Sequence, residues 1–242
     1  VLERAVESLA SLGKLYVAEH FPPEAKAKIE ELVTNLKAAY HARIEKLDWM
    51  GAETKKEALK KLDTSTIKVG YPDHARDYSA LVIHGDDLIG NVKVCAAADW
   101  AFYRGRFAGS VDRTDWGMTP QTNDAYNGSL RDIVFPAGIL QPPIFDPNAD
   151  PAINYGAAGG WIGHELTHGF DDQGRKIDAT GKLRDWWTAQ DAETFKKRAD
   201  VLGAQYSKFE PLPGVKVNGE LTMGENIADL GGLTLALDAY RA

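Results

Sequence analysis

The sequence lacks the features that mark several large classes of protein. Cys95 is the only cysteine, so no disulfide can form within the chain and a disulfide-stabilised scaffold is excluded. No apolar run approaches the roughly 20 residues of a membrane-spanning helix, so no span is expected in this chain. Basic residues form no cluster and the net charge is -7, which argues against a nucleic-acid partner.

The composition that is present suits a folded and largely helical protein. The chain has 242 residues, of which 44% are hydrophobic, enough for one large domain or two small ones. Apolar spacing and helix-start signals predict helices over residues 1–19, 22–47, 87–110, 153–169, 188–209 and 222–242, and a charged helix after Gly51. In the segment 87–110, the residues expected to be buried are Leu88, Val92, Cys95, Trp100 and Phe107. Cys95 is then a small core residue rather than a nucleophile.

Short strands are expected only in the middle of the chain. Residues 66–72 form a loop or short strand, and two strands over 119–126 and 131–135 are joined through Asn127 and Gly128. The apolar run 133–143 is broken by prolines, so it cannot be a long central strand. A small hairpin is expected over 175–183. The sequence therefore predicts an α+β fold that is predominantly helical.

The segment from Gly163 to Gly169 carries the pattern H-E-x-x-H. His164 and His168 are four positions apart, so in a helix they lie on one face, one turn from each other. Two imidazoles placed in this way can hold one Zn²⁺ ion. Glu165 borders the same patch, where it could act on a zinc-bound water. The pattern is typical of a zinc hydrolase.

A zinc site needs at least three protein ligands, and Glu225 is the candidate for the third. Asp229 is four residues further along the same predicted helix and could accept the free ring N–H of a ligating histidine. Asp171, three residues after His168, is a second candidate for that supporting role. However, Thr222-x-x-Glu225 also matches a capping box, in which Glu225 would serve only its own helix end. The ligand interpretation is favoured because two histidines without a third ligand make a poor site.

Several blocks of the sequence, taken together, resemble the neprilysin family of zinc endopeptidases, which includes endothelin-converting enzyme and bacterial oligopeptidases. The matching blocks are Trp49 to Lys56, Ile67 to Asp73, Ile133 to Pro143, Ile162 to Gly174, Asp185 to Trp187 and Gly224 to Gly232. They occur in the family's order and cover essentially the whole chain. This combination is far more specific than H-E-x-x-H alone.

The resemblance implies a thermolysin-like gluzincin core with N-terminal helices from a capping lobe. Residues 1–75 are then a helical segment linking the capping lobe to the catalytic domain, and residues 76–242 are the catalytic core. Family members are much longer, and a later C-terminal stretch supplies a histidine and an arginine that hold the oxyanion and the substrate. The chain is therefore expected to be a fragment, and its partners to include the remaining parts of the same enzyme.

The resemblance also implies a role for each matching site residue. His164, His168 and Glu225 match the ligands of one zinc ion per chain, Glu165 the catalytic base and Asp229 the supporting aspartate. Asn123 matches the asparagine that binds the backbone of a peptide, and Ile139 and Ile144 match the pocket for a bulky apolar side chain after the scissile bond. Two residues depart from the family pattern, Asp124 in the substrate strand and Trp161 beside the zinc, and both are expected to affect peptide preference.

The function implied is zinc-dependent hydrolysis of peptide bonds in oligopeptides. Three alternatives are open: a zinc-binding but catalytically inactive peptide-binding domain, a helical interaction module with an accidental H-E-x-x-H, and a hydrolase acting on a non-peptide amide. Family members usually work in the periplasm or outside the cell, although some bacterial members are cytoplasmic. The absence of cysteine pairs favours a bacterial member.

Overall fold

The computed structural model describes residues 10–74, 77–128 and 132–242. Its helices are α2 (Ala10–His20), α3 (Pro23–Lys46), α4 (Ala52–Thr64), α5 (Leu88–Arg106), α6 (Pro151–Asn154), α7 (Gly160–His168), α8 (Ala189–Tyr206) and α9 (Met223–Arg241). A π-helix at Tyr155–Gly159 joins α6 to α7, and a 3-10 turn spans Gly174–Lys176. The strands are β1 (Thr66–Gly70), β2 (Tyr126–Gly128) and β3 (Asp132–Pro136). The predicted helical α+β class is confirmed, while the part of the first helix predicted over residues 1–9 lies outside the described residues.

The strands form one small sheet in the order β1-β3-β2. β3 is parallel to β1 and antiparallel to β2, and its Ile133, Val134 and Phe135 are buried. β3 is thus a central strand, but a short one that ends at Pro136, as its proline-broken sequence requires.

The strand predicted over residues 119–126 is wrong along most of its length, since only Tyr126 belongs to β2. The Thr122 N–H donates to the Thr119 carbonyl, and the Gly138 N–H donates to the Pro120 carbonyl. The segment is therefore a turn that packs its backbone directly on Gly138, where a Cβ would lie 2.6 Å from the Thr122 oxygen. The predicted Asn127-Gly128 turn is also wrong, because both residues lie within β2.

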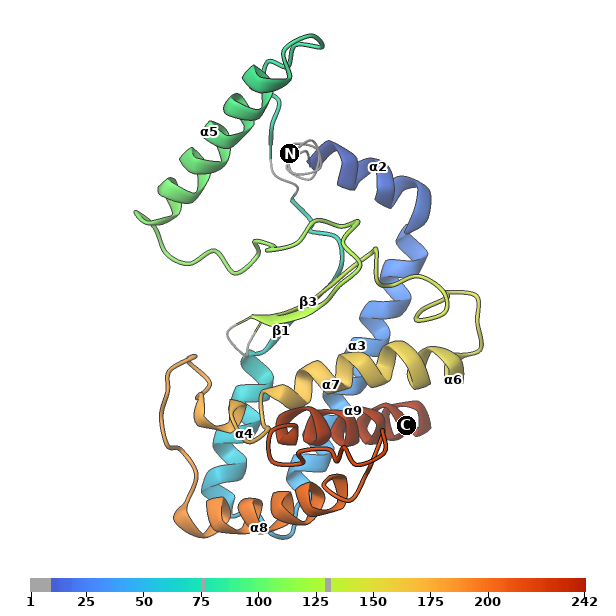
Figure 1. Ribbon diagram of the computed structural model, residues 1–242, viewed down its shortest axis with the longest axis vertical. Helices are drawn as coiled ribbons and strands as arrows, with labels where there is room; N and C mark the ends of the chain where they lie inside the picture. Colours follow the sequence, from blue (N-terminus) through green and yellow to red (C-terminus); the bar gives the residue numbers. More distant parts are fainter. Residues whose placement is uncertain (1–9, 75–76, 129–131) are drawn as a thin grey trace.

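Helix α3 is the longest of the described helices and runs through the lower part of the molecule in Figure 1. Pro23 stands at its first position, where a missing N–H costs nothing. Its buried residues recur at spacings of three or four and face α4, α9 and β1. They are Ala25, Ile29, Leu32, Leu36, Tyr40 and Ile44.

Helix α5 is where the predicted burial is wrong. Of the five residues expected in a core, only Cys95 is buried, while Trp100 is 65% and Phe107 is 88% exposed. Leu88 is also exposed and Val92 is half-buried. Figure 1 shows α5 projecting away from the other helices, and no other described helix or strand packs extensively against it. Periodic apolar residues identified the helix, but most of the residues expected to be buried are exposed or only half-buried.

The start of α8 links two distant parts of the chain. The Thr188 hydroxyl accepts from the Asp191 N–H at 3.2 Å and so caps this helix. The Asp191 carboxylate contacts the start of α4, where it accepts from the Gly51 N–H at 3.1 Å and from the Thr54 hydroxyl at 2.6 Å. It therefore fixes the start of α4 against the start of α8.

Helices α7 and α9 lie side by side and carry the residues singled out by the sequence (Figure 1). Their backbones approach closely at glycines: a Cβ on Gly163 would lie 2.8 Å from the Gly232 oxygen, and one on Gly232 would lie 2.5 Å from the Gly160 oxygen. Larger residues at these positions would push the helices apart. The two glycines therefore set the short distance across which side chains of α7 and α9 meet.

The helix predicted over 153–169 is present but contains the π-helical turn. The Ala158 N–H donates at 3.1 Å to the carbonyl of Ile144, which lies outside the helix, so the regular backbone pattern is interrupted there. Such single π turns occur frequently at functional sites. The hairpin predicted over 175–183 is reduced to one antiparallel bridge between Ile177 and Leu183.

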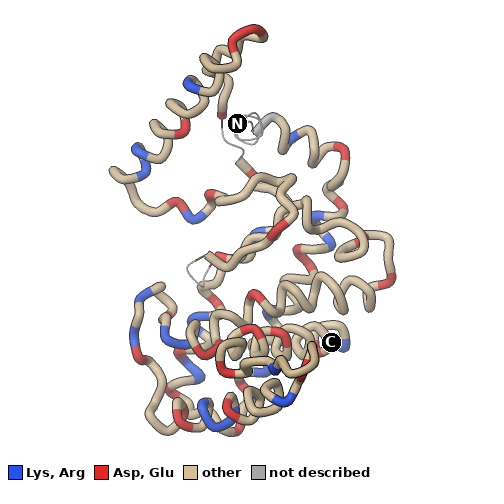
Figure 2. The backbone as a smooth tube through the Cα atoms, in the orientation of Figure 1, with Lys and Arg blue, Asp and Glu red and all other residues tan. Residues whose placement is uncertain are grey.

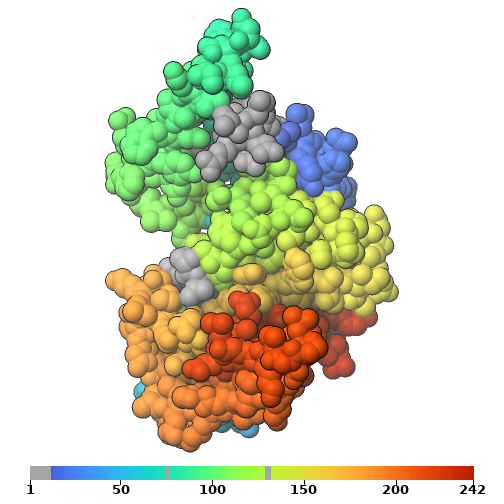
Figure 3. All heavy atoms as spheres, in the orientation of Figure 1, coloured from blue at the N-terminus to red at the C-terminus, as the bar shows by residue number. Residues whose placement is uncertain are grey.

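Charged residues of both signs are spread along the described part of the chain. Figure 2 shows lysines and arginines interspersed with acidic residues along the backbone. In Figure 3, the orange and red segments of the last third of the chain cover the lower part of the visible face. Among the described helices, none combines the length and apolar character that crossing a bilayer requires.

Candidate metal centre

The two histidines of α7 point their rings at one another. Nε2 of His164 lies 2.9 Å from Nε2 of His168, and the ring planes are perpendicular. This is the one-turn geometry expected for residues four apart in a helix. Both side chains are mostly shielded from solvent, with 21% and 17% exposed. The structure therefore brings together the first two predicted ligands.

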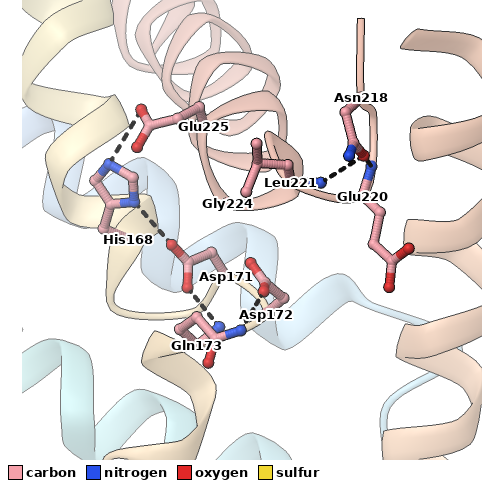
Figure 4. Close-up of a pocket in the computed structure, with 9 residues that line it drawn as sticks. All are labelled: His168, Asp171, Asp172, Gln173, Asn218, Glu220, Leu221, Gly224 and Glu225. Carbon is pink, nitrogen blue, oxygen red and sulfur yellow. Dashed lines mark hydrogen bonds and ion pairs between the residues drawn. The ribbon is translucent and has the colours of Figure 1, made fainter. Parts of the chain in front are cut away.

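Glu225 reaches the same point from α9, as Figure 4 shows for its approach to His168. Its Oε2 lies 3.3 Å from Nε2 of His164 and 3.7 Å from Nε2 of His168. Donor atoms around a tetrahedral zinc at about 2.0–2.1 Å are separated by about 3.3 Å. The observed separations bracket that value, so these three side chains fit one zinc ion; the ligand atoms all lie within 4.8 Å of one another.

The capping-box alternative for Glu225 does not match the structure. Thr222 precedes α9 but makes no side-chain cap hydrogen bond. Its N–H donates to the Asn218 carbonyl, and its hydroxyl accepts from the amide of Asn226 at 2.9 Å. The Glu225 carboxylate faces the histidines instead.

Each histidine has a carboxylate on its other ring nitrogen. Asp229 Oδ1 lies 2.8 Å from Nδ1 of His164, and Asp171 Oδ2 lies 2.7 Å from Nδ1 of His168. A carboxylate only accepts, so each Nδ1 donates its proton and the lone pair is left on Nε2. The two aspartates considered in the sequence are thus both used, one for each ring.

Asp171 is the more deeply buried of these aspartates. Its burial alone would raise its pKa, but the hydrogen bond with His168 and the N–H groups of Gly174 and Gln173 hold the pKa below its usual value. In return, the hydrogen bond with Asp171 raises the pKa of His168. This pair fixes the ring of His168 in the orientation that turns Nε2 toward Glu225.

Glu165 lies beside the histidines with its carboxylate partly withdrawn from water. Burial raises its pKa, and the neighbouring His168 and His164 oppose that shift. Its backbone carbonyl accepts from the side-chain amide of Asn127 on β2 at 2.7 Å. Asn127 was expected only in a turn, so no pattern in the sequence indicated this link between the sheet and α7.

A cavity of about 500 Å³ opens on one side of the histidine pair. Three of the five predicted substrate-binding residues line it, namely Asp124, Ile139 and Trp161, together with His164 and Glu165. Asn123 is exposed and Ile144 is half-buried, and neither is among the lining residues. Further lining residues are Ala125, Phe135, Gly156, Gly160, Asp229 and Leu233.

A second cavity, of about 670 Å³, lies on the other side of the site and is shown in Figure 4. His168, Asp171 and Glu225 form its inner wall. Its other lining residues are mostly polar: Asp172, Gln173, Asn218, Glu220, Leu221 and Gly224. The three candidate ligands therefore line the two cavities, His164 the first and His168 with Glu225 the second.

Comparison of the sequence with known proteins also points to peptidases. Two sequence models described as peptidase family M13 match residues 5–72 and 123–242. The chain is 39% identical to human endothelin-converting enzyme-like 1 over 238 residues, covering 96% of this chain and 31% of the relative. It is 37% identical to a putative zinc metalloproteinase of Streptococcus gordonii, of which it covers 41%.

Among solved structures, the zinc metalloprotease ZMP1 of Mycobacterium tuberculosis in its open state is similar with a TM-score of 0.91 and 51% identity. That match covers 98% of this chain and 38% of the other. The inhibitor complex of the same protein gives a TM-score of 0.82. The chain spans between about a third and two fifths of the length of these relatives.

Proposed function

The chain belongs to peptidase family M13, and on this premise we propose that it carries the zinc centre of an endopeptidase that cleaves oligopeptides. The observation that supports this most is the convergence of His164, His168 and Glu225, from α7 and α9, at separations that suit one zinc ion. Each imidazole is also oriented by an aspartate, as zinc-ligating histidines commonly are.

Zinc held there would supply a polarised scissile carbonyl and a bound water whose pKa is lowered toward about 7. The chain's own contribution is the Glu165 carboxylate. It takes the proton of the attacking water on a carboxylate oxygen and later delivers it to the amine of the departing peptide half. Burial raises the pKa of Glu165, which brings this group closer to the operating pH of a proton carrier.

The substrate backbone is proposed to lie along β2. This strand is at the edge of the sheet, since β3 pairs with it on one side only. An edge strand can add an extended peptide through backbone hydrogen bonds, with Asn123 just ahead of it as a further backbone partner. Such pairing tolerates many sequences, so selectivity must come from side-chain pockets.

The cavity of about 500 Å³ is proposed to receive the side chain after the scissile bond. Ile139 on its wall, with Ile144 nearby, favours a bulky apolar side chain. Trp161 and Asp124 also line this cavity, to which they add a bulky ring and an acidic group. We expect both residues to restrict which peptides are accepted.

The whole enzyme is proposed to be longer, because the chain spans only 31% of the human relative. We propose that residues 1–75 link a capping lobe to a catalytic domain that begins near residue 76, and that one zinc ion binds per chain. The histidine and arginine that the family places further along would hold the oxyanion; losing one such donor costs about 100- to 1,000-fold in rate. We therefore expect weak activity from residues 1–242 alone, and a periplasmic or extracellular location for the whole enzyme.

A peptide-cleavage assay tests the proposed function. A quenched fluorescent peptide with phenylalanine or leucine after the scissile bond is incubated with the longest available form of the protein, with and without a zinc chelator. The proposal expects cleavage that the chelator stops and added zinc restores. A zinc-loaded protein that binds the peptide without cleaving it would instead support the inactive peptide-binding alternative.

A further inference from the structure

One lysine of α4 is buried beneath the end of α7. Lys61 is only 1% exposed, although the other lysines of α4 are exposed or half-buried. Its Nζ donates to the carbonyl oxygens of Gly169, Gly174 and Ile177, the last two at 2.7 Å. Burying an ammonium group costs free energy unless its hydrogen bonds are satisfied. Lys61 is therefore not simply a charged residue on the solvent face of α4.

The three carbonyls use all three N–H donors of an ammonium group. Gly169 is the residue that follows the last residue of α7, and the last carbonyls of a helix form the negative end of its dipole. Lys61 therefore supplies a positive charge at the carboxyl end of α7. Two of its acceptors, Gly174 and Ile177, lie further along the chain, so the same ammonium also binds the segment that follows α7.

That segment carries Asp171, the carboxylate that orients His168. Asp171 Oδ1 accepts from the Gln173 N–H at 2.9 Å and from the Gly174 N–H at 2.7 Å, while its Oδ2 bonds His168. Gly174 sits so close to α7 that a Cβ there would lie 1.7 Å from the His168 oxygen. Lys61 thus holds the backbone on both sides of Asp171, at Gly169 before it and at Gly174 after it.

A second contact supports the same segment from α3. The Phe170 ring lies 5.2 Å from the ring of Tyr40 in an edge-on arrangement, and Lys61 Nζ lies 5.4 Å from the centre of the Phe170 ring. The segment is therefore held between α3 and α4, and the Lys61 ammonium bonds three carbonyls at or near it.

We propose that Lys61 is a positioning residue of the metal centre, which sets the place of Asp171 and, through it, the orientation of the His168 ring. It is neither one of the three grouped ligands nor a lining residue of the two cavities described above, and it acts through three backbone carbonyls. This inference rests on the proposed zinc site. It predicts that the ammonium of Lys61 contributes to zinc affinity although it lies outside the site.

The test compares Lys61→Met with the parent chain and with Lys37→Met as a matched control. Lys37 also donates to a backbone carbonyl, that of Ser65 at 3.0 Å, but away from the segment after α7. Zinc affinity is measured on the full chain by competition with a chromophoric chelator, and the absorption spectrum of the Co²⁺-substituted protein is recorded. We expect Lys61→Met to lose about 10- to 100-fold in zinc affinity, as changes in outer partners of ligands do, and to alter the Co²⁺ spectrum. Lys37→Met should stay within about twofold of the parent, as expected where no partner of a ligand is disturbed.

A double mutant separates positioning from a general loss of stability. If Lys61 acts through Asp171, then Lys61→Met should weaken zinc binding much less in an Asp171→Asn background than in the parent. If the fold-losses of zinc affinity in the two single mutants multiply in the double mutant, the proposal is overturned, because Lys61 then acts independently of Asp171. A folded Lys61→Met chain with parental zinc affinity would overturn it as well.

Lys61→Gln covers the case in which the methionine variant does not fold. Glutamine keeps two N–H donors but loses the charge and the third bond, so a smaller loss of zinc affinity, about 3- to 10-fold, is expected from the lower end of the range for outer partners of ligands. An affinity within twofold of the parent would contradict the proposal. If the parent chain itself binds no zinc, the proposed function fails first and the role of Lys61 falls with it; if the parent binds zinc and both variants match it, only the role of Lys61 fails.

Discussion

Asp229 Oδ1 lies 2.8 Å from Nδ1 of His164, and this contact joins α9 to α7 directly behind the candidate zinc position. The equivalent contact on His168 comes from Asp171, which is close to its partner along the chain. The two carboxylates differ in environment, since the side chain of Asp229 is 68% exposed and that of Asp171 only 8%. Water can replace the first far more easily than the second.

This difference predicts an order of effects on zinc affinity. Removing an outer partner of a metal ligand typically costs 10- to 100-fold in affinity, so we expect about 10-fold for Asp229→Asn and closer to about 100-fold for Asp171→Asn. Chelator competition on the two variants measures both values. The reverse order would show that burial of the partner carboxylate does not decide its contribution.

Glu165→Gln is expected to separate metal binding from turnover. The variant keeps the shape of the side chain but cannot accept the proton of the attacking water, so peptide cleavage should fall by about 100- to 10,000-fold. Zinc affinity should remain parental, because the Glu165 carboxylate is not one of the three grouped ligands. Steady-state kinetics and metal analysis on the same preparation give both readouts. Parental turnover would remove Glu165 from the mechanism.

Trp161 is expected to limit the size of the accepted side chain. Its indole is 47% exposed and lines the cavity beside His164, so Trp161→Val should enlarge the opening. Cleavage of peptides with tryptophan after the scissile bond should rise relative to those with alanine, by about 10- to 200-fold at most for a pocket contact. Trp100→Val is the matched control, because Trp100 is an exposed tryptophan on α5, away from the cavity. An unchanged ratio in Trp161→Val would exclude this pocket assignment.

Asp178 gives a prediction about acid stability. Hydrogen bonds from the Thr180 hydroxyl and from Arg184 hold the pKa of Asp178 well below its usual range. A pKa lowered in the folded state adds stability above the unfolded-state pKa of about 3.9, and this stability is lost as the pH falls through the folded pKa. Asp178→Asn should therefore unfold at lower urea concentration than the parent at pH 7, and the difference between their urea midpoints should be smaller at pH 3. A larger difference at pH 3 than at pH 7 would contradict this expectation. Asp200→Asn, which breaks only an exposed pair with Lys196, should change little at either pH.

The features that sequence predicted well depend on short-range spacing. His164 and His168 meet because four residues make about one helical turn, and Glu225 and Asp229 share a face of α9 for the same reason. The resemblance to known peptidases joined these two helices, and the glycines at 163 and 232 explain how closely they pack. The residues grouped around the metal position were therefore predictable from spacing and family resemblance together.

The features that could not be predicted from the sequence depend on which part of the chain packs against a given helix or strand. The apolar face of α5 predicted burial, but no described element covers Trp100 or Phe107. In the sequence, Lys61 is one of several charged residues on a polar helix. In the structure, it is buried and bonded to three carbonyl groups of a distant segment. One signal was available, because Lys61 stands beside Leu62 and three residues after Ala58, both of which are buried. The π turn before α7, where the Ala158 N–H donates to the Ile144 carbonyl, left no comparable pattern in the sequence.

The number of zinc ions bound per chain shows whether one metal ion is held between α7 and α9. Native mass spectrometry is applied to the parent chain, to Glu225→Gln and to Glu220→Gln, a glutamate on the adjacent acidic cavity that is not among the grouped ligands. We expect one zinc ion per chain in the parent and in Glu220→Gln, and loss of that ion in Glu225→Gln at the same zinc concentration. Retention of zinc with parental affinity by Glu225→Gln would show that Glu225 is not a ligand of the ion.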